Sequence, residues 1–344
     1  MNSNFFQLLM EKDSIFKQFL KKLESIAHLS EKYKQTLAYL FFNYMSMLRK
    51  HNIALEPPLQ LFDTFLELLN KQIEDPFIFE PYHQQITTPF DYYHFGLEFI
   101  QPIVDWDHSS VSGLEELNKI VSYLEKKENV IFLSNHQTEA DPQLLLLMLN
   151  KTHPLLAKNM IFVAGERVIT DPLTIPFSLG LNLLCIYSKR YIDQPPELKV
   201  NKQLHNKRTM EMMSHLLKEG GKSIWVAPSG GRDRRNAAGV VEVAPFDPQS
   251  LEMFYLMTQK SNRPTHFFPL ILATYDLLPP PETIQVELGE ERFVQRNSIH
   301  IAFGEEISMD HFPGCENKEK HQRRKLRAEH IDNIVKKKYS CFKL

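Results

Sequence analysis

Two side chains of this sequence have the types and the spacing of a catalytic acid–base pair. His136 and Asp141 stand five positions apart in the segment SNHQTEADP, directly after the apolar run VIFL. A carboxylate at this spacing can lie beside the imidazole on a turn that enters a helix, where it makes the ring a competent general base. Chance supplies roughly 0.6 such pairs in a chain of this composition, so the pattern alone is weak. Its position after a strand, where α/β folds place active sites, strengthens it.

Three other interpretations stand beside this one. Asn135 or Asp141 could simply cap the helix that follows. Ser229 could be a nucleophile, but its segment APSGG lacks the first glycine of the G-x-S-x-G elbow. No metal site is indicated, because His136 has no second histidine at ligand spacing and Glu139 with Asp141 does not define a coordination sphere.

Basic side chains follow two further strand-like runs. Arg232 and Arg234 come after SIWVA and the turn PSGG, whose two glycines indicate a sharp bend or a close approach to a ligand. Lys189 and Arg190 come directly after the run LLCIYS. Arginine binds phosphate through charge-assisted, bidentate hydrogen bonds. These four side chains therefore predict a cationic pocket for a small molecule that carries a phosphate; the alternative is a solvated basic turn.

Apolar runs of strand length alternate with helical segments over most of the chain. The expected strands are residues 130–133, 161–164, 183–187, 223–227, 266–274, 284–288 and 299–303, with helices at 142–149 and 202–218. This alternation predicts an α/β fold with a mixed, largely parallel sheet flanked by helices.

The N-terminal part of the chain has a different pattern. Apolar residues recur at helical spacing over residues 4–73, which predicts a small helical bundle. Ser30 is expected to cap its second helix, and Pro57–Pro58 suits the first turn of the third. Residues 75–96, rich in aromatic residues and proline, are expected to form a wrapping connection. We therefore predict a bundle domain at 1–80, which shields the α/β domain at 81–344 or docks a carrier protein or membrane.

Composition limits the classes of partner. Lys and Arg number 40 against 42 Asp and Glu, giving a net charge of -2, which disfavours binding of nucleic acid through bulk charge but leaves local basic patches open. Three cysteines do not make a disulfide framework and indicate a reducing compartment. No signal peptide or membrane span is visible, so we expect a soluble chain whose contact with lipid is peripheral.

Several segments, in order, resemble one enzyme family. They are NHQTEADP, AGERVITDPLTIPFSLGLNLLCIYSKR, IWVAPSGGRDR and FFPLILATYDLLPPP, which lie within a region of similarity over residues 75–305. Together they look like the soluble, plastid-type glycerol-3-phosphate 1-O-acyltransferases, which occur in plastid stroma and in some bacteria. The resemblance implies a helical N-terminal domain, an α/β catalytic domain, and a location in the stroma or the bacterial cytoplasm.

The resemblance also implies an activity. A fatty acyl group would pass from acyl-acyl carrier protein, or from acyl-CoA, to the 1-hydroxyl of sn-glycerol 3-phosphate, with no other cofactor. His136 would be the base and Asp141 its partner, while Arg232 and Arg234 match the phosphate-binding arginines. Arg190 stands where the family pattern can carry lysine. Tyr191 stands where it can carry histidine, a departure that leaves the total positive charge of the pocket open.

From the residues alone, we expect direct attack of the deprotonated hydroxyl on the thioester, without an acyl-enzyme. Backbone N–H groups near residues 229–231 are candidates for the oxyanion donor. The alternatives are an acyltransferase for a lysophospholipid or dihydroxyacetone phosphate, a thioesterase, and a non-catalytic module that binds lipid or carrier protein.

The C-terminal segment 318–344 is strongly basic, with ten Lys or Arg against three acidic residues. Ile331, Ile334 and Val335 predict one apolar helical stripe within it. The segment is either a solvated helix face or a landing site for an acidic partner or anionic lipid. The helix around Lys202, Lys207 and Arg208 could likewise steer a carrier protein or face a membrane.

Overall fold

The computed structural model describes residues 13–188, 192–281 and 288–342. Within these ranges, one mixed sheet has the strand order β1-β5-β4-β6-β3-β9-β10-β2. In this order, the five strands from β5 to β9 are mutually parallel. β1 pairs antiparallel with β5, and β10 pairs antiparallel with β9 but parallel with the edge strand β2. Its strands are β1 (Tyr82–His83), β2 (Ser110–Ser112), β3 (Asn129–Ser134), β4 (Ile161–Gly165), β5 (Asn182–Ile186), β6 (Ser223–Val226), β9 (Thr265–Ala273) and β10 (His300–Phe303). The predicted α/β architecture with a largely parallel sheet is confirmed.

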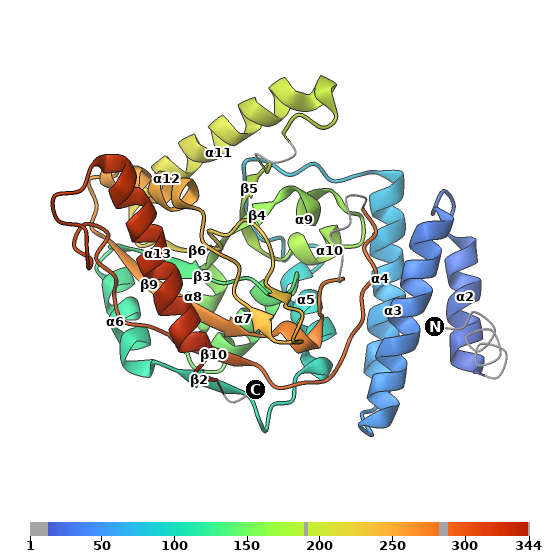
Figure 1. The fold of residues 1–344 in the computed structure, drawn as a ribbon. Coiled ribbons are helices and arrows are strands. Elements are labelled where there is room, and N and C mark those ends of the chain that lie inside the picture. Colours follow the sequence, from blue (N-terminus) through green and yellow to red (C-terminus); the bar gives the residue numbers. More distant parts are fainter. Residues whose placement is uncertain (1–12, 189–191, 282–287, 343–344) are drawn as a thin grey trace.

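Helices cover both faces of this sheet, and a short hairpin of β7 (Arg234–Arg235) and β8 (Val241–Glu242) lies outside it (Figure 1). The helices are α2 (Ser14–Ser25), α3 (Glu31–Lys50), α4 (Glu56–Glu74), α5 (Tyr92–Ile100), α6 (Leu114–Glu125), α7 (Asp141–Asn150), α8 (Pro154–Asn159), α9 (Glu166–Thr170), α10 (Ile175–Ser178), α11 (Lys199–Glu219), α12 (Pro248–Gln259) and α13 (Lys320–Tyr339). Short 3-10 turns lie at Gln101–Ile103, Pro196–Leu198 and Tyr275–Leu277.

The central strand β3 shows why the sheet is covered on both sides. Successive side chains of a strand point to opposite faces. Val130 and Phe132 belong to the cluster that α5, α7 and the N-terminal helices share, whereas Ile131 and Leu133 belong to the cluster under α11, α12 and α13. A fully apolar run such as VIFL is therefore stable only when both faces are packed.

The order of strands brings the two candidate loops together. β3 pairs in parallel with β6, with Leu133 opposite Val226, so the carboxyl ends of both strands lie at the same edge of the sheet. The loop that carries His136 follows β3, and the loop that carries Arg232 follows β6. Chemistry far apart in the sequence is thus joined by the register of two strands.

The helices α2, α3 and α4 pack through aromatic side chains, as the helical periodicity predicts. Phe19 stacks on Phe41 with ring centroids 3.8 Å apart, and Phe62 meets Phe41 edge-on at 5.0 Å. Ser30 accepts a hydrogen bond from the Tyr33 amide at the start of α3, and prolines stand in the first turn of α4. One hydrophobic cluster runs from these helices into the sheet, and the division into domains at residue 80 stays a prediction.

The C-terminal helix α13 shows the predicted apolar stripe. Ile331 and Val335 are buried, and the helix packs on β9 and α12. Arg327 is also buried and pairs with Glu252 at 2.5 Å, so part of the basic charge is neutralised inside the fold.

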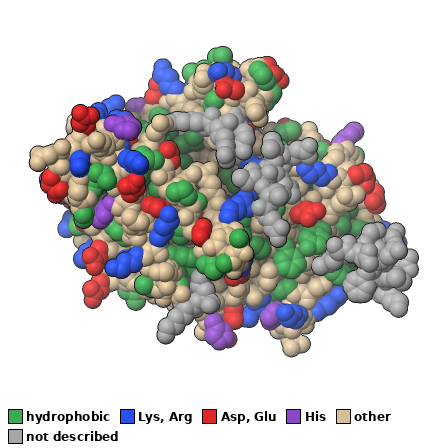
Figure 2. All heavy atoms as spheres, viewed as in Figure 1, with side chains coloured by type: hydrophobic (Ala, Val, Ile, Leu, Met, Phe, Trp, Pro, Cys, Tyr) green, Lys and Arg blue, Asp and Glu red, His purple; other side chains and the backbone are tan. Residues whose placement is uncertain are grey.

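Charged side chains of both signs are interspersed over the face shown in Figure 2. No helix in the described ranges is long and apolar enough to span a membrane.

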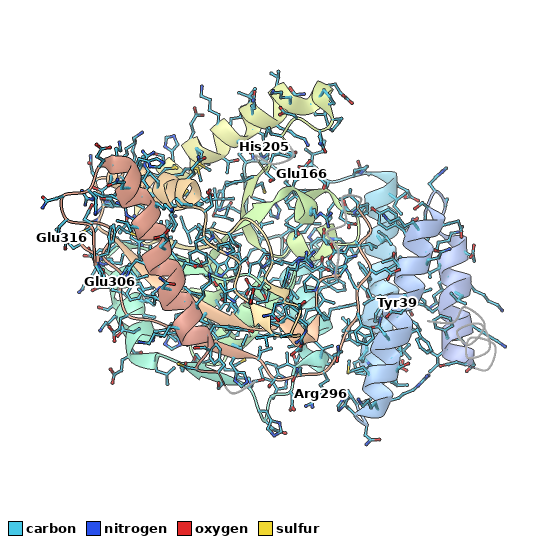
Figure 3. All side chains as sticks on the ribbon, viewed as in Figure 1. Tyr39, Glu166, His205, Arg296, Glu306 and Glu316 are labelled. Carbon is cyan, nitrogen blue, oxygen red and sulfur yellow. The ribbon has the colours of Figure 1, made fainter. Side chains whose placement is uncertain are left out.

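The extended segment 288–294, which we call the strap, lies against α3. Lys32 donates to the Leu288 carbonyl at 2.6 Å, and Asn43 bonds both the Arg292 carbonyl and the Val294 amide at 3.1 Å. Tyr39 lies on the same helix with its ring centroid 6.4 Å from that of Phe293 (Figure 3). The N-terminal helices therefore hold the backbone of a segment far along the chain.

Two expectations need comment. The connection at 75–96 ends earlier than predicted, because Asp91 caps helix α5 by accepting from the His94 amide, and Tyr92 and Phe95 are buried. The predicted strand at 284–288 lies almost wholly outside the described residues.

Gly180 provides a test of this packing. A Cβ atom there would lie 2.4 Å from the Tyr92 carbonyl oxygen, a backbone atom that cannot rotate away. We expect Gly180→Ala to lower the free energy of unfolding by about 1–3 kcal/mol in urea titrations. Gly165→Ala is the matched control, since its Cβ meets nothing within 4 Å. Equal stability of the two variants would contradict this packing.

Candidate active site

His136 and Asp141 form the predicted pair. The His136 ring nitrogen Nδ1 lies 2.8 Å from Asp141 Oδ2. The Asp141 side chain is fully buried, whereas the His136 side chain is one-quarter exposed, at 25%. With Nδ1 engaged by the carboxylate, Nε2 is the ring nitrogen that can take a proton from a substrate. The Trp225 ring meets His136 edge-on at 5.7 Å between centroids and limits the rotation of the imidazole.

Additional hydrogen bonds fix the Asp141 carboxylate. The Gln137 amide donates to Oδ2 at 2.7 Å, and the Thr274 hydroxyl donates to Oδ1 at 2.6 Å. Thr138 adds a longer bond of 3.4 Å to Oδ1. The carboxylate stands at the start of α7, where the helix N-terminus also favours a negative charge.

The simple capping interpretation of this segment is wrong. Asn135 is buried. Its side-chain amide donates to the Leu272 carbonyl at 2.9 Å and accepts from the Leu272 N–H at 2.8 Å, which continues the pairing of β3 with β9 beyond the strand end. The residue before α7 is Ala140, which provides no side-chain cap. Asp141 instead bonds the imidazole.

Asp233 joins the loop after β6 to the loop after β3. Its amide donates to the His136 carbonyl at 2.6 Å, and its carboxylate accepts from Asn135 at 2.8 Å and Gln137 at 3.1 Å. The Ala244 amide also donates to it, at 2.8 Å. Burial outweighs these bonds and raises the pKa of Asp233 to about 6. Sequence reasoning passed over Asp233, although it stands between the two arginines that were singled out.

The predicted phosphate-binding residues are only partly described. Arg232 donates to the Glu290 carboxylate at 2.6 and 2.8 Å. Arg234 donates to the Pro281 carbonyl, and burial, followed by the positive charge of Arg232, lowers the pKa of its guanidinium. Lys189 and Arg190, with Tyr191, lie outside the described residues. The structure thus places two of the four predicted cations, and both are engaged by groups of the chain.

A buried ion-pair network adjoins these arginines. Arg292 pairs with Glu139 of the His136 loop and lies 3.6 Å from Asp171. Arg167 pairs with Glu290 at 2.6 Å. Burial opposes ionisation of Glu139, but Arg292 holds the pKa of this carboxyl below its usual value.

Sequence reasoning missed these pairs for different reasons. Arg167 and Asp171 lie inside the quoted block AGERVITDP without an assigned role. Glu290 and Arg292 lie in the segment GEER, which has no motif and is distant in sequence from its partners.

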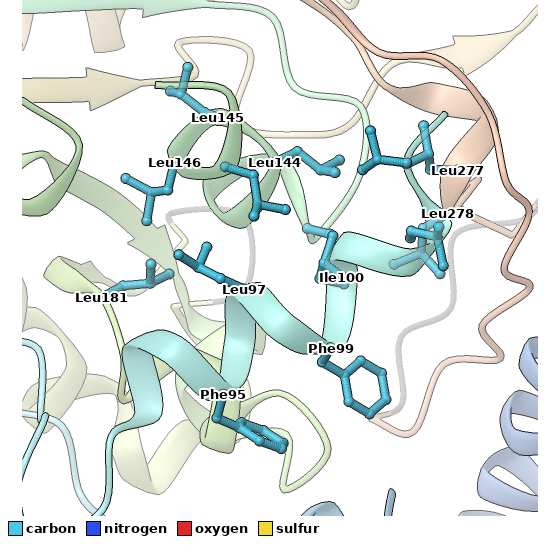
Figure 4. Packing of buried hydrophobic residues seen from close by; sticks show 14 of the residues in the cluster. Phe95, Leu97, Phe99, Ile100, Leu144, Leu145, Leu146, Leu181, Leu277 and Leu278 are labelled. Carbon is cyan, nitrogen blue, oxygen red and sulfur yellow. The ribbon is translucent and has the colours of Figure 1, made fainter. Parts of the chain in front are cut away.

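An apolar cavity of about 140 Å³ opens beside the base. Its wall includes His136 and Trp225 together with residues of the N-terminal helices. Figure 4 shows part of this wall, in which Phe99 and Ile100 of α5 lie near Leu181 and Leu278 from other segments. The N-terminal contribution comes from Leu40, Tyr44 and Phe65.

One of the candidate oxyanion donors already has a partner within the chain. The Gly230 amide donates to the Ala227 carbonyl at 3.1 Å within its turn, so this member of the triplet 229–231 is not directed at a substrate. In the part of the chain that the structure describes, no group of three His, Cys, Asp or Glu residues is placed to hold a metal ion.

The chain is similar to known acyltransferases. The Acyltransferase family model matches residues 108–273. "Glycerol-3-phosphate acyltransferase, chloroplastic" from Spinacia oleracea is 37% identical over 328 residues, which are 94% of this chain and 69% of that protein. "Glycerol-3-phosphate acyltransferase ATS12, chloroplastic" from Cucurbita moschata is 44% identical over 246 residues, 71% of this chain and 53% of that protein. "Glycerol-3-phosphate acyltransferase, chloroplastic" from Arabidopsis thaliana is 40% identical over 247 residues, 71% and 54% of the two chains. The match thus spans about half the length of the latter two relatives.

The raised pKa of Asp233 makes a prediction for stability. Between pH 4 and about 6 the folded state keeps the proton that the unfolded state loses, so the contribution of Asp233 to stability falls as the pH rises through this window. Relative to Asp233→Asn, which does not titrate, the wild type should lose on the order of 3 kcal/mol between pH 4 and 7. Urea unfolding across this range measures the difference, and a constant difference would contradict the assignment.

Proposed function

The chain belongs to the family of chloroplast glycerol-3-phosphate acyltransferases, and we propose on this premise that it transfers a fatty acyl group from a thioester to the 1-hydroxyl of sn-glycerol 3-phosphate. The product is 1-acylglycerol 3-phosphate, the first intermediate of phospholipid synthesis. The observation that carries the proposal is the His136–Asp141 pair, with its 2.8 Å bond, at the wall of an apolar cavity and beside a cluster of arginines.

The reaction needs one base and no covalent intermediate. His136 Nε2 takes the proton of the acceptor hydroxyl as its oxygen attacks the thioester carbonyl. Asp141 holds the ring through Nδ1 and stabilises the imidazolium that forms. The carbonyl carbon then expels the thiolate, which takes up the proton from His136. General-base assistance of this kind contributes roughly 10²–10⁴-fold to the rate.

The apolar cavity is the site for the acyl chain of the donor. Its lining of Phe, Leu and Ile side chains suits an alkyl chain and excludes water from the thioester. Its volume of about 140 Å³ is below the roughly 300–1,000 Å³ of most ligand pockets. We therefore expect side chains of the wall, such as Phe65 on α4, to move when the acyl chain enters.

The arginines bind the acceptor. Arg232 and Arg234 would hold the phosphate by charge-assisted hydrogen bonds, assisted by Lys189 and Arg190. Fixing the phosphate fixes the position of the 1-hydroxyl against His136, and orientation of two bound substrates supplies on the order of 7–11 kcal/mol at best.

The donor is a thioester of acyl carrier protein or of coenzyme A. The projecting helix α11 offers a surface to such a partner, since Lys207 and Arg208 are exposed there and Val200 is 72% exposed. In its first turn, Lys202 pairs with Glu166 of α9 at 2.6 Å. An acidic carrier protein or an anionic membrane, to which the product passes, would be attracted to this surface. The plastid stroma fits the chloroplast relatives, and the bacterial cytoplasm remains the alternative location.

The base assignment is tested by His136→Ala. We expect the rate of acyl transfer to radiolabelled glycerol 3-phosphate to fall by at least roughly 10²–10⁴-fold, while glycerol 3-phosphate still binds in calorimetry. His311→Ala, at an exposed histidine outside the proposed site and outside α11, is the matched control and should keep the wild-type rate. Near-normal rates in purified His136→Ala would exclude this residue as the base.

The phosphate assignment is tested by Arg232→Ala. Loss of charge-assisted bonds of about 1.5–3 kcal/mol should raise the KM for glycerol 3-phosphate by roughly 10- to 100-fold. Arg235→Ala is the control, because Arg235 is more exposed and pairs with Asp276. An unchanged KM in Arg232→Ala would remove this residue from the phosphate site. Lysophospholipid and dihydroxyacetone phosphate, offered in the same assay, test the alternative acceptors.

A further inference from the structure

One carboxylate of the strap is shared by two arginines. Glu290 accepts from Arg232 at 2.6 and 2.8 Å and from Arg167 at 2.6 Å. The Glu290 side chain is 8% exposed, and that of Arg232 is 14% exposed. A buried carboxylate between two guanidinium groups occupies the position that an anionic ligand of those groups would take.

We propose that Arg167 and Arg232 form an anion site which Glu290 fills in the unliganded protein, and that the phosphate of the acceptor replaces the Glu290 carboxylate there. Arg167 is then a phosphate-binding residue of its own, and Glu290 is an internal competitor of the substrate. This inference rests on the proposed function for the identity of the phosphate-bearing ligand.

The charges favour this exchange. Arg167, Arg232 and Arg292 face Glu139, Asp171 and Glu290, so the network is neutral as it stands. Release of Glu290 from its two arginines leaves two positive charges, which match a phosphate dianion. The carboxylate supplies one negative charge to these groups and the phosphate supplies about two, so the ligand is the stronger partner.

The exchange moves the Glu290 side chain and not the strap, because the backbone on either side of Glu290 is held. Thr36 donates to the Gly289 carbonyl at 3.3 Å, and the Gly289 amide donates to Asp171 at 2.9 Å. Beyond Glu290, Arg292 is anchored by Glu139, and Asn43 bonds its carbonyl at 3.1 Å. Glu290 therefore stays close to the arginines that it releases.

The anion site is also joined to the base. The backbone N–H of Asp233, which directly follows Arg232, donates to the His136 carbonyl at 2.6 Å. Glu139, which pairs with Arg292, lies in the same loop as His136. A phosphate held by Arg232 is thus positioned relative to His136 by direct backbone contacts.

Inorganic phosphate is the probe for this site, measured by calorimetry at fixed ionic strength on the full chain. Glu290→Gln keeps the shape but removes the competing charge, so its Kd for phosphate should fall by about tenfold or more. Arg167→Ala should raise that Kd by about tenfold or more, both alone and in the Glu290→Gln background. Glu291→Gln, an exposed neighbour in the strap, is the matched control and should bind as the wild type does. Thermal unfolding verifies that each variant is folded.

Two results would overturn the inference. Unchanged or weaker phosphate binding in Glu290→Gln would make Glu290 a support for the arginines rather than a competitor. Unchanged binding in Arg167→Ala would remove Arg167 from the site. These outcomes are independent of acyl transfer: tighter phosphate binding in Glu290→Gln without transfer to glycerol 3-phosphate in the wild type would instead overturn the proposed function.

Discussion

The buried carboxylate of Asp141 is the group on which the candidate site depends. A desolvated charge is stable only when hydrogen bonds replace its water, and here the imidazole of His136, the Gln137 amide and the Thr274 hydroxyl do so. Because Thr274 directly follows β9 and the other two residues follow β3, one carboxylate fixes two strand ends and the ring orientation together. The same bonds that stabilise this end of the sheet therefore present Nε2 of His136 to the cavity.

A second set of buried charges extends from this centre to the N-terminal helices. Glu139 of the His136 loop pairs with Arg292 of the strap, and the strap is held by Asn43 on α3. Breaking such a buried pair would leave an uncompensated charge, at a cost of about 3–5 kcal/mol. These helices thus do more than shield the sheet, since α3 holds the strap and α3 and α4 supply part of the cavity wall.

Sequence reasoning predicted the elements that depend on local patterns. The parallel strands, the helical N-terminal region, the Ser30 cap and the His136–Asp141 pair all rest on periodicity, capping residues or short spacing, and each is present. It could not predict that Glu139 would meet Arg292, 153 positions away, or that Glu290 would lie between Arg167 and Arg232. Such pairs depend on how the strap folds back on the sheet, and no local pattern in GEER encodes this. The roles of Lys189 and Arg190 stay a prediction.

The central claim is that His136 activates the acceptor for direct attack, without an acyl-enzyme. The most direct measurement is a rapid-quench experiment that mixes enzyme and acyl thioester in near-equal amounts without glycerol 3-phosphate and then follows free thiol and the intact mass of the protein. The account predicts no rapid release of thiol before glycerol 3-phosphate is added and consumption of both substrates together afterwards. Acylated protein should be absent throughout. A burst of thiol equal to the enzyme concentration, with the acyl group covalently attached to the chain, would contradict it.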